Sequence, residues 1–384
     1  MILKLKVLHI GKYYFPFSGG IEKVTQDLVE SEVYSREAKV CILAHQDKPG
    51  EKTHYETINN VEVRKVAIAG VLAYAPIAPS FRKELDKAID EFQPDLIHIH
   101  MPNLSAFACL VSRRARKIPW LIHWHSDVIG AVPDFKIKLL YPFYRVFEKA
   151  LLKKSQKVIA TSPPYLEHSS SLVEFKAKCS VVPIGIKNST DIDFSPQQND
   201  HLNLLMIGRL TYYKGHELML KALSQLGEHE KVKLTIIGSG ELKNKLVSSV
   251  TALKLNSRVE FLGHVDEKRL VFELTNTDLL CLPSIEKTEA FGVVLLEAAM
   301  YGKPALVSDV KGSGMSWVVK NGQTGIVVEN NSVDAIVHGL RKVINNSEQL
   351  STMGGNAKAR FAQHFNLHVV ANDMLAAYRE CIKR

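Results

Sequence analysis

The sequence predicts an α/β fold built from two Rossmann-like domains. Short apolar runs typical of strands alternate with helical patterns along most of the chain, and this alternation implies parallel sheets with helices on both faces. The alternation stops in a polar stretch rich in Gly, Ser, Pro and Asn and then starts again, and 384 residues are enough for two domains. We therefore expect an N-terminal domain at 1–186, a linker at 187–202 and a C-terminal domain at 203–365.

The N-terminal domain opens with a predicted strand, a glycine-containing loop and a helix. The strand is Lys6 to Ile10, and Gly19 and Gly20 directly precede the predicted helix at Ile21 to Tyr34. Glycines without a Cβ allow a ligand to approach the backbone closely, although such a pair often marks only a tight turn. Further strands are expected at 40–44, 61–66, 96–99, 120–123 and 158–161, and helices at 81–92, 104–116 and 135–154.

The C-terminal domain begins with a strand at 204–207 and a loop that carries two cations. Arg209 and Lys214 lie on this loop beside Gly208, and a guanidinium with an ammonium is well matched to a pyrophosphate. A G-x-G follows the next strand, but Lys243 occupies the third glycine position of a dinucleotide-binding fingerprint. An oxidoreductase is accordingly disfavoured.

Two carboxylates flank an Ala-Phe-Gly turn in the stretch SIEKTEAFGVVLLEAAMYG. Seven residues separate Glu289 from Glu297, and the turn between a predicted strand at 277–283 and a helix places Gly292 near the helix N-terminus. Unpaired N–H groups at such an end favour a phosphate, and carboxylates accept hydrogen bonds from sugar hydroxyls. A sugar nucleotide fits this combination. On spacing alone, a solvated loop acid and a helix-dipole partner explain the two glutamates equally well.

A histidine cluster follows the strand at 120–123. His125, in HWHSD, stands where ligands of open α/β sheets bind. His123, His125 and Asp127 raise the question of a metal, but one loop with no further ligand is a poor site, so no metal is expected. Asp191 and Asp193 form a D-x-D in the linker, where a solvated pair is the preferred interpretation.

The positive charge is concentrated in the first half of the chain. Residues 1–190 hold 27 Lys plus Arg against 19 Asp plus Glu, whereas the remainder holds 22 against 21. In Lys136 to Lys157 the cations are interleaved with Leu, Tyr and Phe, which is typical of a surface facing anionic lipid. Charge alone leaves nucleic acid open, but no nucleic-acid motif accompanies it. No membrane-spanning segment is expected, and five scattered cysteines favour a reducing cytoplasm.

Five segments together resemble one enzyme family. SGGIEKV, HWHSD, GRLTYYKG, RVEFLGHV and SIEKTEAFGVVLLEA occur in the order found in the family 4 retaining glycosyltransferases of the GT-B fold. The resemblance implies two Rossmann-like domains facing across a cleft, with the sugar nucleotide on the C-terminal domain and the acceptor on the basic N-terminal domain. It also implies a final helix, at about 366–384, that crosses back to the first domain.

The resemblance also implies roles for individual residues. Arg209 and Lys214, beside Gly208, match a pyrophosphate clamp, and Glu297 matches the acid that binds the ribose hydroxyls. The remaining matches are Glu289 with the backbone of Phe291, Gly292 and Val293 for the transferred hexose, His125 for its hydroxymethyl group, Val265 for the base, and Gly19 and Gly20 for the phosphates or the acceptor.

The implied reaction is a retaining hexosyl transfer by front-face substitution, without metal or cofactor. The sequence is similar to bacterial O-antigen and exopolysaccharide mannosyltransferases, so GDP-mannose is the favoured donor, with UDP-glucose, UDP-galactose and UDP-GlcNAc as competitors. The expected acceptor is a polyprenyl-diphosphate-linked glycan, met by a cytoplasmic protein peripheral to the inner face of the membrane. A sugar-nucleotide epimerase, a phosphorylase and a non-catalytic binding subunit remain as rival classes.

Overall fold

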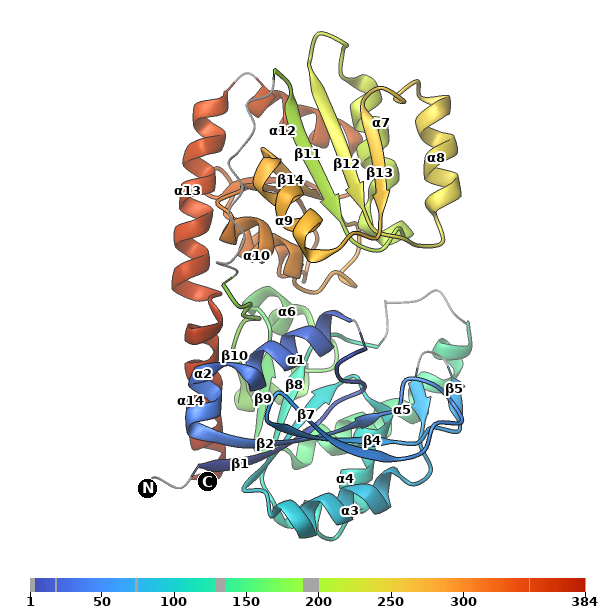
Figure 1. Ribbon diagram of the computed structural model, residues 1–384, viewed down its shortest axis with the longest axis vertical. Coiled ribbons are helices and arrows are strands. Elements are labelled where there is room, and N and C mark those ends of the chain that lie inside the picture. The colour runs from blue at the N-terminus through green and yellow to red at the C-terminus, as the bar shows by residue number, and fades with distance from the viewer. Residues whose placement is uncertain are drawn as a thin grey trace. The chain divides into compact units, whose positions relative to one another are not determined.

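A computed structural model describes residues 4–17, 19–72, 75–128, 135–188, 200–344 and 346–383. The chain divides into unit 1, Met1–Lys187 with Leu367–Arg384, and unit 2, Asn188–Asn366 (Figure 1). Each unit holds a mainly or wholly parallel sheet with helices against it, which confirms the predicted α/β fold of two Rossmann-like domains. Asp191, Asp193 and most of the predicted linker 187–202 lie outside the described residues.

Unit 1 contains an eight-stranded sheet in the order β10-β9-β8-β7-β1-β2-β4-β3. All neighbours are parallel except β3 and β4, an antiparallel pair in which the sequence analysis missed β3. Its strands are β1 Leu5–Ile10, β2 Ala38–His45, β3 His54–Ile58, β4 Val61–Val66, β7 Leu96–Met101, β8 Trp120–Trp124, β9 Lys157–Ala160 and β10 Cys179–Val181, and a separate hairpin pairs β5 Gly70–Leu72 with β6 Ala75–Ile77.

Two of the predicted helices of unit 1 are interrupted. The expected helix at Ile21 to Tyr34 is two helices, α1 Gly20–Glu30 and α2 Glu32–Glu37, because Ser31 is extended and its hydroxyl accepts the N–H of Tyr34. The expected helix at 104–116 is wrong: Ser112 is extended, its hydroxyl accepts the Ala115 N–H, and the segment forms η1 Leu104–Phe107, α4 Ala108–Val111 and η2 Ala115–Lys117. Serine competes in this way by bonding to nearby backbone.

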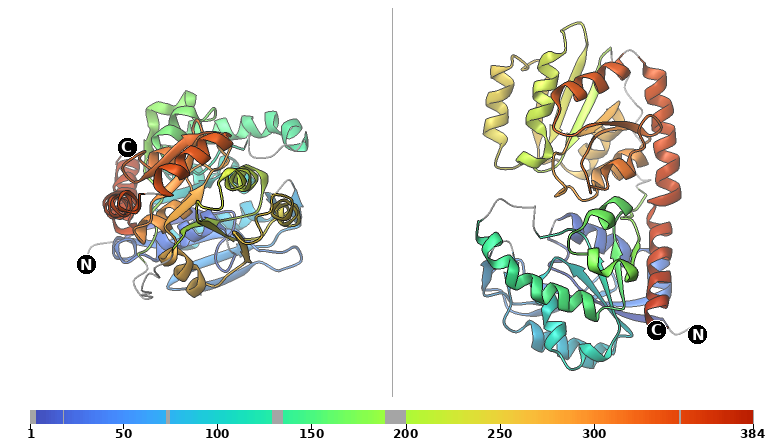
Figure 2. Two further views of the ribbon diagram at one scale, coloured as in Figure 1. Left: turned by 90° about the horizontal axis from the view of Figure 1, so that it is seen from above. Right: turned by 180° about the vertical axis from the view of Figure 1, so that it is seen from behind.

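The other helices of unit 1 are α3 Phe81–Phe92, α5 Phe135–Lys154, α6 Pro163–His168, η3 Val173–Lys178 and the C-terminal α14 Leu367–Ile382. Helix α14 packs on helices α1 and α2 and on strands β7 and β8 (Figures 1 and 2). Hydrogen bonds tie Tyr378 to Tyr34 and Arg379 to Glu37. The last helix is therefore an integral part of unit 1, as the resemblance implied.

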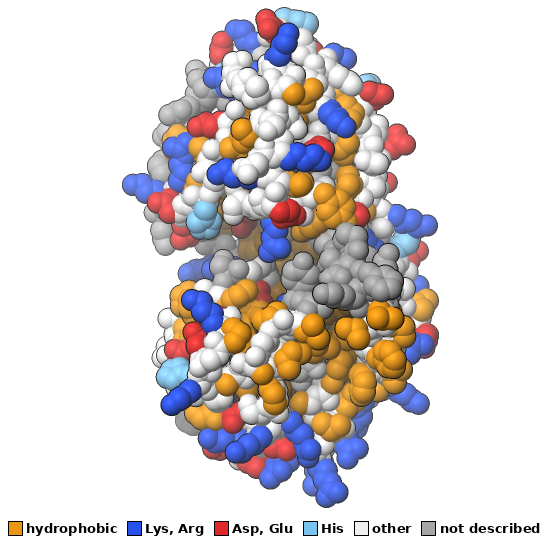
Figure 3. All heavy atoms as spheres, turned by 90° about the vertical axis from the view of Figure 1, so that its right-hand side faces the viewer, with side chains coloured by type: hydrophobic (Ala, Val, Ile, Leu, Met, Phe, Trp, Pro, Cys, Tyr) orange, Lys and Arg blue, Asp and Glu red, His pale blue; other side chains and the backbone are white. Residues whose placement is uncertain are grey.

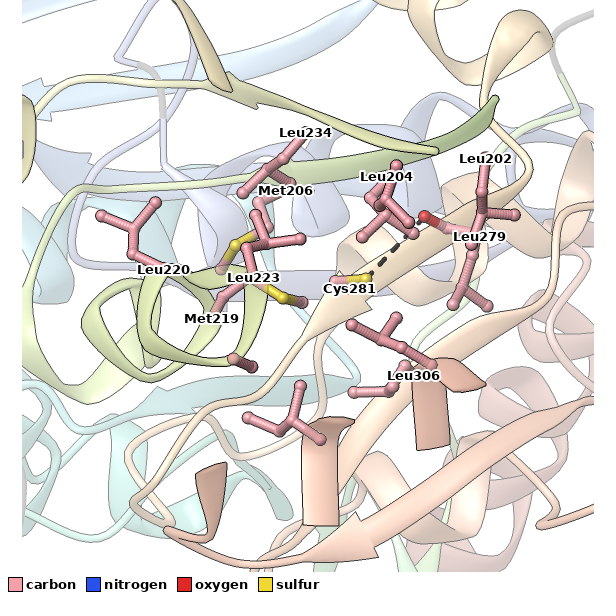
Figure 4. Packing of buried hydrophobic residues seen from close by; sticks show 14 of the residues in the cluster. Leu202, Leu204, Met206, Met219, Leu220, Leu223, Leu234, Leu279, Cys281 and Leu306 are labelled. Atoms are coloured by element: carbon pink, nitrogen blue, oxygen red, sulfur yellow. Dashed lines mark hydrogen bonds between the residues drawn. The ribbon is translucent and has the colours of Figure 1, made fainter. Parts of the chain in front are cut away.

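Unit 2 contains a six-stranded, wholly parallel sheet in the order β13-β12-β11-β14-β15-β16. Leu, Met, Ile and Cys side chains from its strands and from α7 fill its core (Figure 4). The strands are β11 Leu202–Ile207, β12 Val232–Ile237, β13 Val259–Gly263, β14 Leu279–Leu282, β15 Ala305–Asp309 and β16 Gly325–Glu329. The helices are η4 Tyr212–Lys214, α7 His216–Gln225, α8 Lys243–Ala252, α9 Glu267–Asn276, α10 Val293–Met300, α11 Met315–Val318, α12 Val333–Ile344 and α13 Ser347–His364.

Each sheet has one point at which the strand order reverses. In unit 2 it lies between β11 and β14, and in unit 1 between β1 and β7. Loops that leave adjacent parallel strands on opposite sides of such a point diverge, and the space at their carboxyl ends is where open α/β sheets bind ligands. The loops after β11 and β14 carry the predicted residues Gly208, Arg209 and Lys214 and the pair Glu289 and Gly292.

Candidate active site

Lys214 lies directly over the backbone that follows β11. Gly208 has φ of 145°, and a Cβ built on it would lie 3.3 Å from both Cε and Nζ of Lys214. A glycine is required here for both conformation and space. The loop thus folds back so that its ammonium group stands at the carboxyl end of the strand.

A second glycine joins this loop to the one after β14. Gly215 has φ of 76°, and its Cβ would fall 1.9 Å from the carbonyl oxygen of Pro283. Two residues away on each loop, the N–H of Ile285 donates to the carbonyl of Tyr213 at 2.8 Å. The two loops at the strand-order reversal are therefore packed backbone against backbone.

This contact brings Lys214 and Glu289 together as an ion pair. Their side chains are only 13% and 12% exposed, so neither charge is well solvated in the absence of the other. The two residues were predicted to share one binding site, but their direct contact was not predicted. The pair is poised to exchange partners, because a bound phosphate can take the ammonium and a sugar hydroxyl the carboxylate.

The glutamate is held by its own loop as well. Ser313 donates its hydroxyl to the carbonyl of Glu289, and the N–H of Gly314 donates to the carbonyl of Ala290 at 2.8 Å. Both donors come from the loop after β15. These hydrogen bonds are accepted by backbone carbonyls, so they hold the backbone of Glu289 in place and do not occupy its carboxylate.

The turn before α10 presents its backbone rather than its side chains. Gly292 caps the helix with φ of 81°, and Phe291 is 3% exposed, with its ring edge-to-face against Phe365 and Trp317. The anchored ring fixes the turn, and the first N–H groups of α10 have no partner within the helix. Together with the helix dipole they favour an anion at this end.

Arg209 and Lys214 both place a positive charge near Tyr213. Arg209 is exposed, and its guanidinium forms no hydrogen bond or ion pair with any residue in the described parts of the chain. Burial raises the pKa of Tyr213, while the charges of Lys214 and Arg209 oppose that rise and those of Glu289 and Glu241 support it. The phenol ring of Tyr213 is thus surrounded by the charged groups of the loop.

Two further donor-binding candidates, Glu297 and Val265, also lie on unit 2. Glu297 is half-buried in the second turn of α10, and Val265 is half-buried just after β13, at the far edge of the sheet. His216, at the first position of α7, was not considered in the sequence analysis. Burial, with a smaller effect of Lys214, lowers its pKa to about 4, so it is neutral at pH 7 and adds no charge to the site.

In unit 1, His125 follows β8 and is buried. Its N–H donates to the carbonyl of Met101 at 3.0 Å, and burial holds the pKa of its imidazole well below the ordinary value. Asp127, by contrast, has a structural role, since its carboxylate accepts from the indole of Trp124 at 2.9 Å and from Ser169 at 2.6 Å. The three residues of the H-x-H-x-D motif therefore do not act as one set.

Gly19 and Gly20 begin α1, and a carboxylate already lies against the first of them. A Cβ on Gly19 would clash with Oε2 of Glu22, which is 9% exposed. Burial raises the pKa of Glu22, and the charge of Lys12 lowers it. A carboxylate at this end of the helix is better matched to acceptor hydroxyls than to phosphate. Glu22 was missed, although it is part of the quoted SGGIEKV segment.

Comparisons with known proteins place the chain among glycosyltransferases. The model of the Glycosyl transferase 4-like domain matches residues 19–185, and that of Glycosyl transferases group 1 matches residues 188–360. The chain is 29% identical to D-rhamnosyltransferase WbpZ of Pseudomonas aeruginosa, over 94% of this chain and 92% of that protein. It is 26% identical to O-antigen chain mannosyltransferase C of Escherichia coli, over 97% of each. The structure of HepE from Anabaena, solved with UDP-glucose, superposes with a TM-score of 0.72 at 18% identity, over 98% of this chain and 99% of that one.

Proposed function

Because the chain belongs to the family 4 glycosyltransferases of the GT-B fold, we propose that it transfers a hexose from a nucleotide sugar to a growing polysaccharide or lipopolysaccharide. The observation that carries the proposal is the ion pair of Lys214 and Glu289, next to the open N-terminus of α10. A cation, a carboxylate and the N-terminus of a helix match the diphosphate and the hexose of such a donor.

The proposed chemistry is a front-face substitution with retention. Lys214 and Arg209 neutralise the diphosphate as it leaves, and its own oxygen accepts the proton of the incoming hydroxyl. Stabilising the charge that develops on the leaving group and holding the reactants in position supply most of the rate. In this scheme Glu289 binds the hexose, Glu297 the ribose and Val265 the base, and no metal takes part.

GDP-mannose is the donor that we favour. Two of the relatives are named for transfer of mannose and of D-rhamnose, which is 6-deoxymannose. UDP-glucose is the alternative, because the fold neighbour HepE was solved with it. A panel of GDP- and UDP-sugars, tested by thermal shift and then by mass analysis of a short lipid-linked acceptor, separates the two. We expect a mannosylated acceptor whose proton NMR spectrum shows an α-anomeric signal. Donor hydrolysis or epimer release without a glycosylated acceptor would contradict the transferase assignment.

The acceptor side of the proposal rests on a hydrophobic surface of unit 1. Helix α5 exposes Leu139, Phe143, Val146 and Phe147, with Phe143 71% exposed. Their spacing of three to four residues places them on one face of the helix, and Lys153 and Lys154 are exposed in its last turn. Figure 3 shows hydrophobic side chains gathered on a face of this unit, with lysines and arginines at its margin. This surface is matched to the interface of an anionic membrane that carries a polyprenyl-linked glycan.

None of the helices in the described ranges is long and apolar enough to span a bilayer. Contact with lipid through α5 is then interfacial, and it is testable by flotation with vesicles of phosphatidylcholine with and without phosphatidylglycerol. We expect the wild-type chain to float with the anionic vesicles and Phe143→Ser to float several-fold less. Val247→Ser, which removes an exposed apolar side chain from α8 of unit 2, is the control. Equal flotation of all three proteins would remove α5 from the proposal.

A further inference from the structure

Five histidines of unit 1 are buried side by side in the centre of its sheet. His9 lies on β1, His98 and His100 on β7, His123 on β8 and His125 just after it. All are at most 5% exposed, and burial lowers the pKa of each, to about 3 for His9 and about 4 for His123. They are accordingly neutral imidazoles, each with one nitrogen that donates and one that accepts.

Four of these rings and two tyrosines form a continuous hydrogen-bonded chain. His125 Nε2 lies 3.0 Å from His100 Nδ1, and His100 Nε2 lies 3.1 Å from His9 Nδ1. From His9 the chain continues through Tyr34, 2.9 Å from Nε2, to Tyr378 at 2.7 Å and then to His98 at 2.6 Å. It therefore runs from the ligand end of β8 to the C-terminal helix α14.

The ring geometry favours protons rather than a metal ion in this cluster. Nitrogens of His100, His123 and His125 lie within 4.8 Å of one another, as do those of His9, His98 and His100. However, the rings of His100 and His125 are inclined by only 9°, and those of His123 and His125 are stacked at 25°. In-plane lone pairs of nearly parallel rings do not converge on one point, as a tetrahedral ion requires.

The chain couples the tautomers of its members. If His100 donates from Nδ1 to His125, then Nε2 of His100 must accept from Nδ1 of His9. Nε2 of His9 must in turn accept from the hydroxyl of Tyr34. Reversing any one of these three bonds reverses the other two. The far nitrogen of His125, Nδ1, is buried without a partner in the described residues. The tautomers of His100 and His9 therefore determine whether His125 Nδ1 offers a proton or a lone pair to a sugar hydroxyl.

We propose that Tyr34, His9 and His100 are positioning residues, which set the tautomer of His125 and so the polarity of the hydrogen bond that His125 Nδ1 forms with a sugar hydroxyl. The proposal rests on the proposed function for the identity of that ligand, but the coupling itself is a property of the free protein. A hydroxyl can both donate and accept, and a fixed partner orients it before the reaction rather than during it.

Tyr34→Phe tests the coupling, because it removes one hydroxyl from the middle of the chain and keeps the ring that packs against Tyr378. In the full-length protein with ¹⁵N-labelled histidine, long-range ¹H–¹⁵N spectra report the tautomer of each imidazole. We expect His9, His100 and His125 to share one tautomer population in the wild type, and Tyr34→Phe to change the ¹⁵N shifts of His125 although three hydrogen bonds separate the two residues. Tyr14→Phe, which removes another buried hydroxyl of unit 1, should leave them unchanged.

Activity gives the second readout. With GDP-mannose as the donor, Tyr34→Phe should lower kcat about three- to tenfold, the effect of one hydrogen bond, with a smaller change in KM, while Tyr14→Phe retains wild-type kcat. Unchanged His125 shifts in Tyr34→Phe would overturn the proposal, as would different tautomers at His100 and His125 or one equivalent of Zn²⁺ bound by the wild type and not by His123→Ala. If the shifts respond but no donor is turned over, the proposed function fails and the coupling stands.

Discussion

At the scale of single residues, unit 2 combines a partly buried ion pair with a solvent-exposed cation. Lys214 and Glu289 compensate each other, so each also stabilises the loop that carries the other. Arg209 has no such role, because it is exposed and has no partner among the residues described. The charge of Arg209 is available to a ligand. Removing this side chain leaves no buried charged group unpaired in the folded protein.

Arg209→Ala should therefore reduce turnover without loss of stability. Removing one group that stabilises charge in a transition state costs roughly 10²–10³ in kcat. The control is Arg341→Ala, an exposed arginine of unit 2 whose partner is Glu230. Steady-state kinetics and thermal denaturation of both variants check the prediction. Wild-type turnover in Arg209→Ala would remove this residue from the mechanism.

At the scale of secondary-structure elements, the site depends on how two loops meet. Neither β11 nor β14 contributes a side chain to the proposed diphosphate site. The strands fix where their loops begin, and Gly215 allows its loop to approach Pro283 of the other. A short helix, α10, then supplies free N–H groups at the meeting point. The backbone is thus as much a part of the site as the charged groups.

Two glycine substitutions separate close packing from backbone conformation. Gly215 and Gly322 have similar φ angles, 76° and 73°, but a Cβ on Gly215 would collide with Pro283 whereas one on Gly322 would meet nothing within 4 Å. Gly322→Ala should cost only about 1–2 kcal/mol for the left-handed conformation. Gly215→Ala should cost clearly more and also weaken nucleotide binding, as measured by urea denaturation and calorimetry. Equal losses in the two variants would show that the loops are not held together by this contact.

At the scale of the whole chain, the two units differ in their buried titratable groups. Among the described residues, unit 1 buries six histidines whose pKa values burial lowers: the five of the cluster and His45, at about 4. Unit 2 buries His216. A lowered pKa means that the unfolded chain binds the proton first, so stability falls as the pH drops below about 6.5 and continues to fall toward pH 4.

Acidification should therefore unfold unit 1 before unit 2. Calorimetric scans from pH 7.5 to 5.5 are expected to show one transition moving to lower temperature more steeply than the other, with peptides of unit 1 losing hydrogen-exchange protection first. Buried carboxyl groups such as Glu22 and Glu148 act in the opposite sense, because burial raises their pKa values and the folded chain then binds the proton first. Parallel shifts of both transitions would contradict the assignment of neutral histidines to unit 1.

The sequence was sufficient to predict the architecture because alternation and loop composition are local signals. Helices such as Phe81–Phe92 were predicted to the residue, whereas the helix expected at 104–116 failed, because Ser112 bonds to nearby backbone in preference to continuing it. Motif residues placed Lys214 and Glu289 in one site, but these residues are 75 positions apart in the sequence. Their contact comes from the adjacency of β11 and β14, which no motif predicts. The histidine chain likewise needs the strand order, since His9, His100 and His125 are far apart in sequence.

The central claim is that the loops after β11 and β14 hold the diphosphate of a nucleotide sugar. Titration calorimetry of GDP into the full-length wild type, Lys214→Ala and Lys245→Ala tests it most directly, since Lys245 is an exposed lysine of the same unit paired with Glu217. We predict that wild type and Lys245→Ala bind GDP with the same affinity and that Lys214→Ala binds at least about tenfold more weakly, as expected for loss of a charge-assisted bond. Equal GDP affinity in all three proteins would contradict the account.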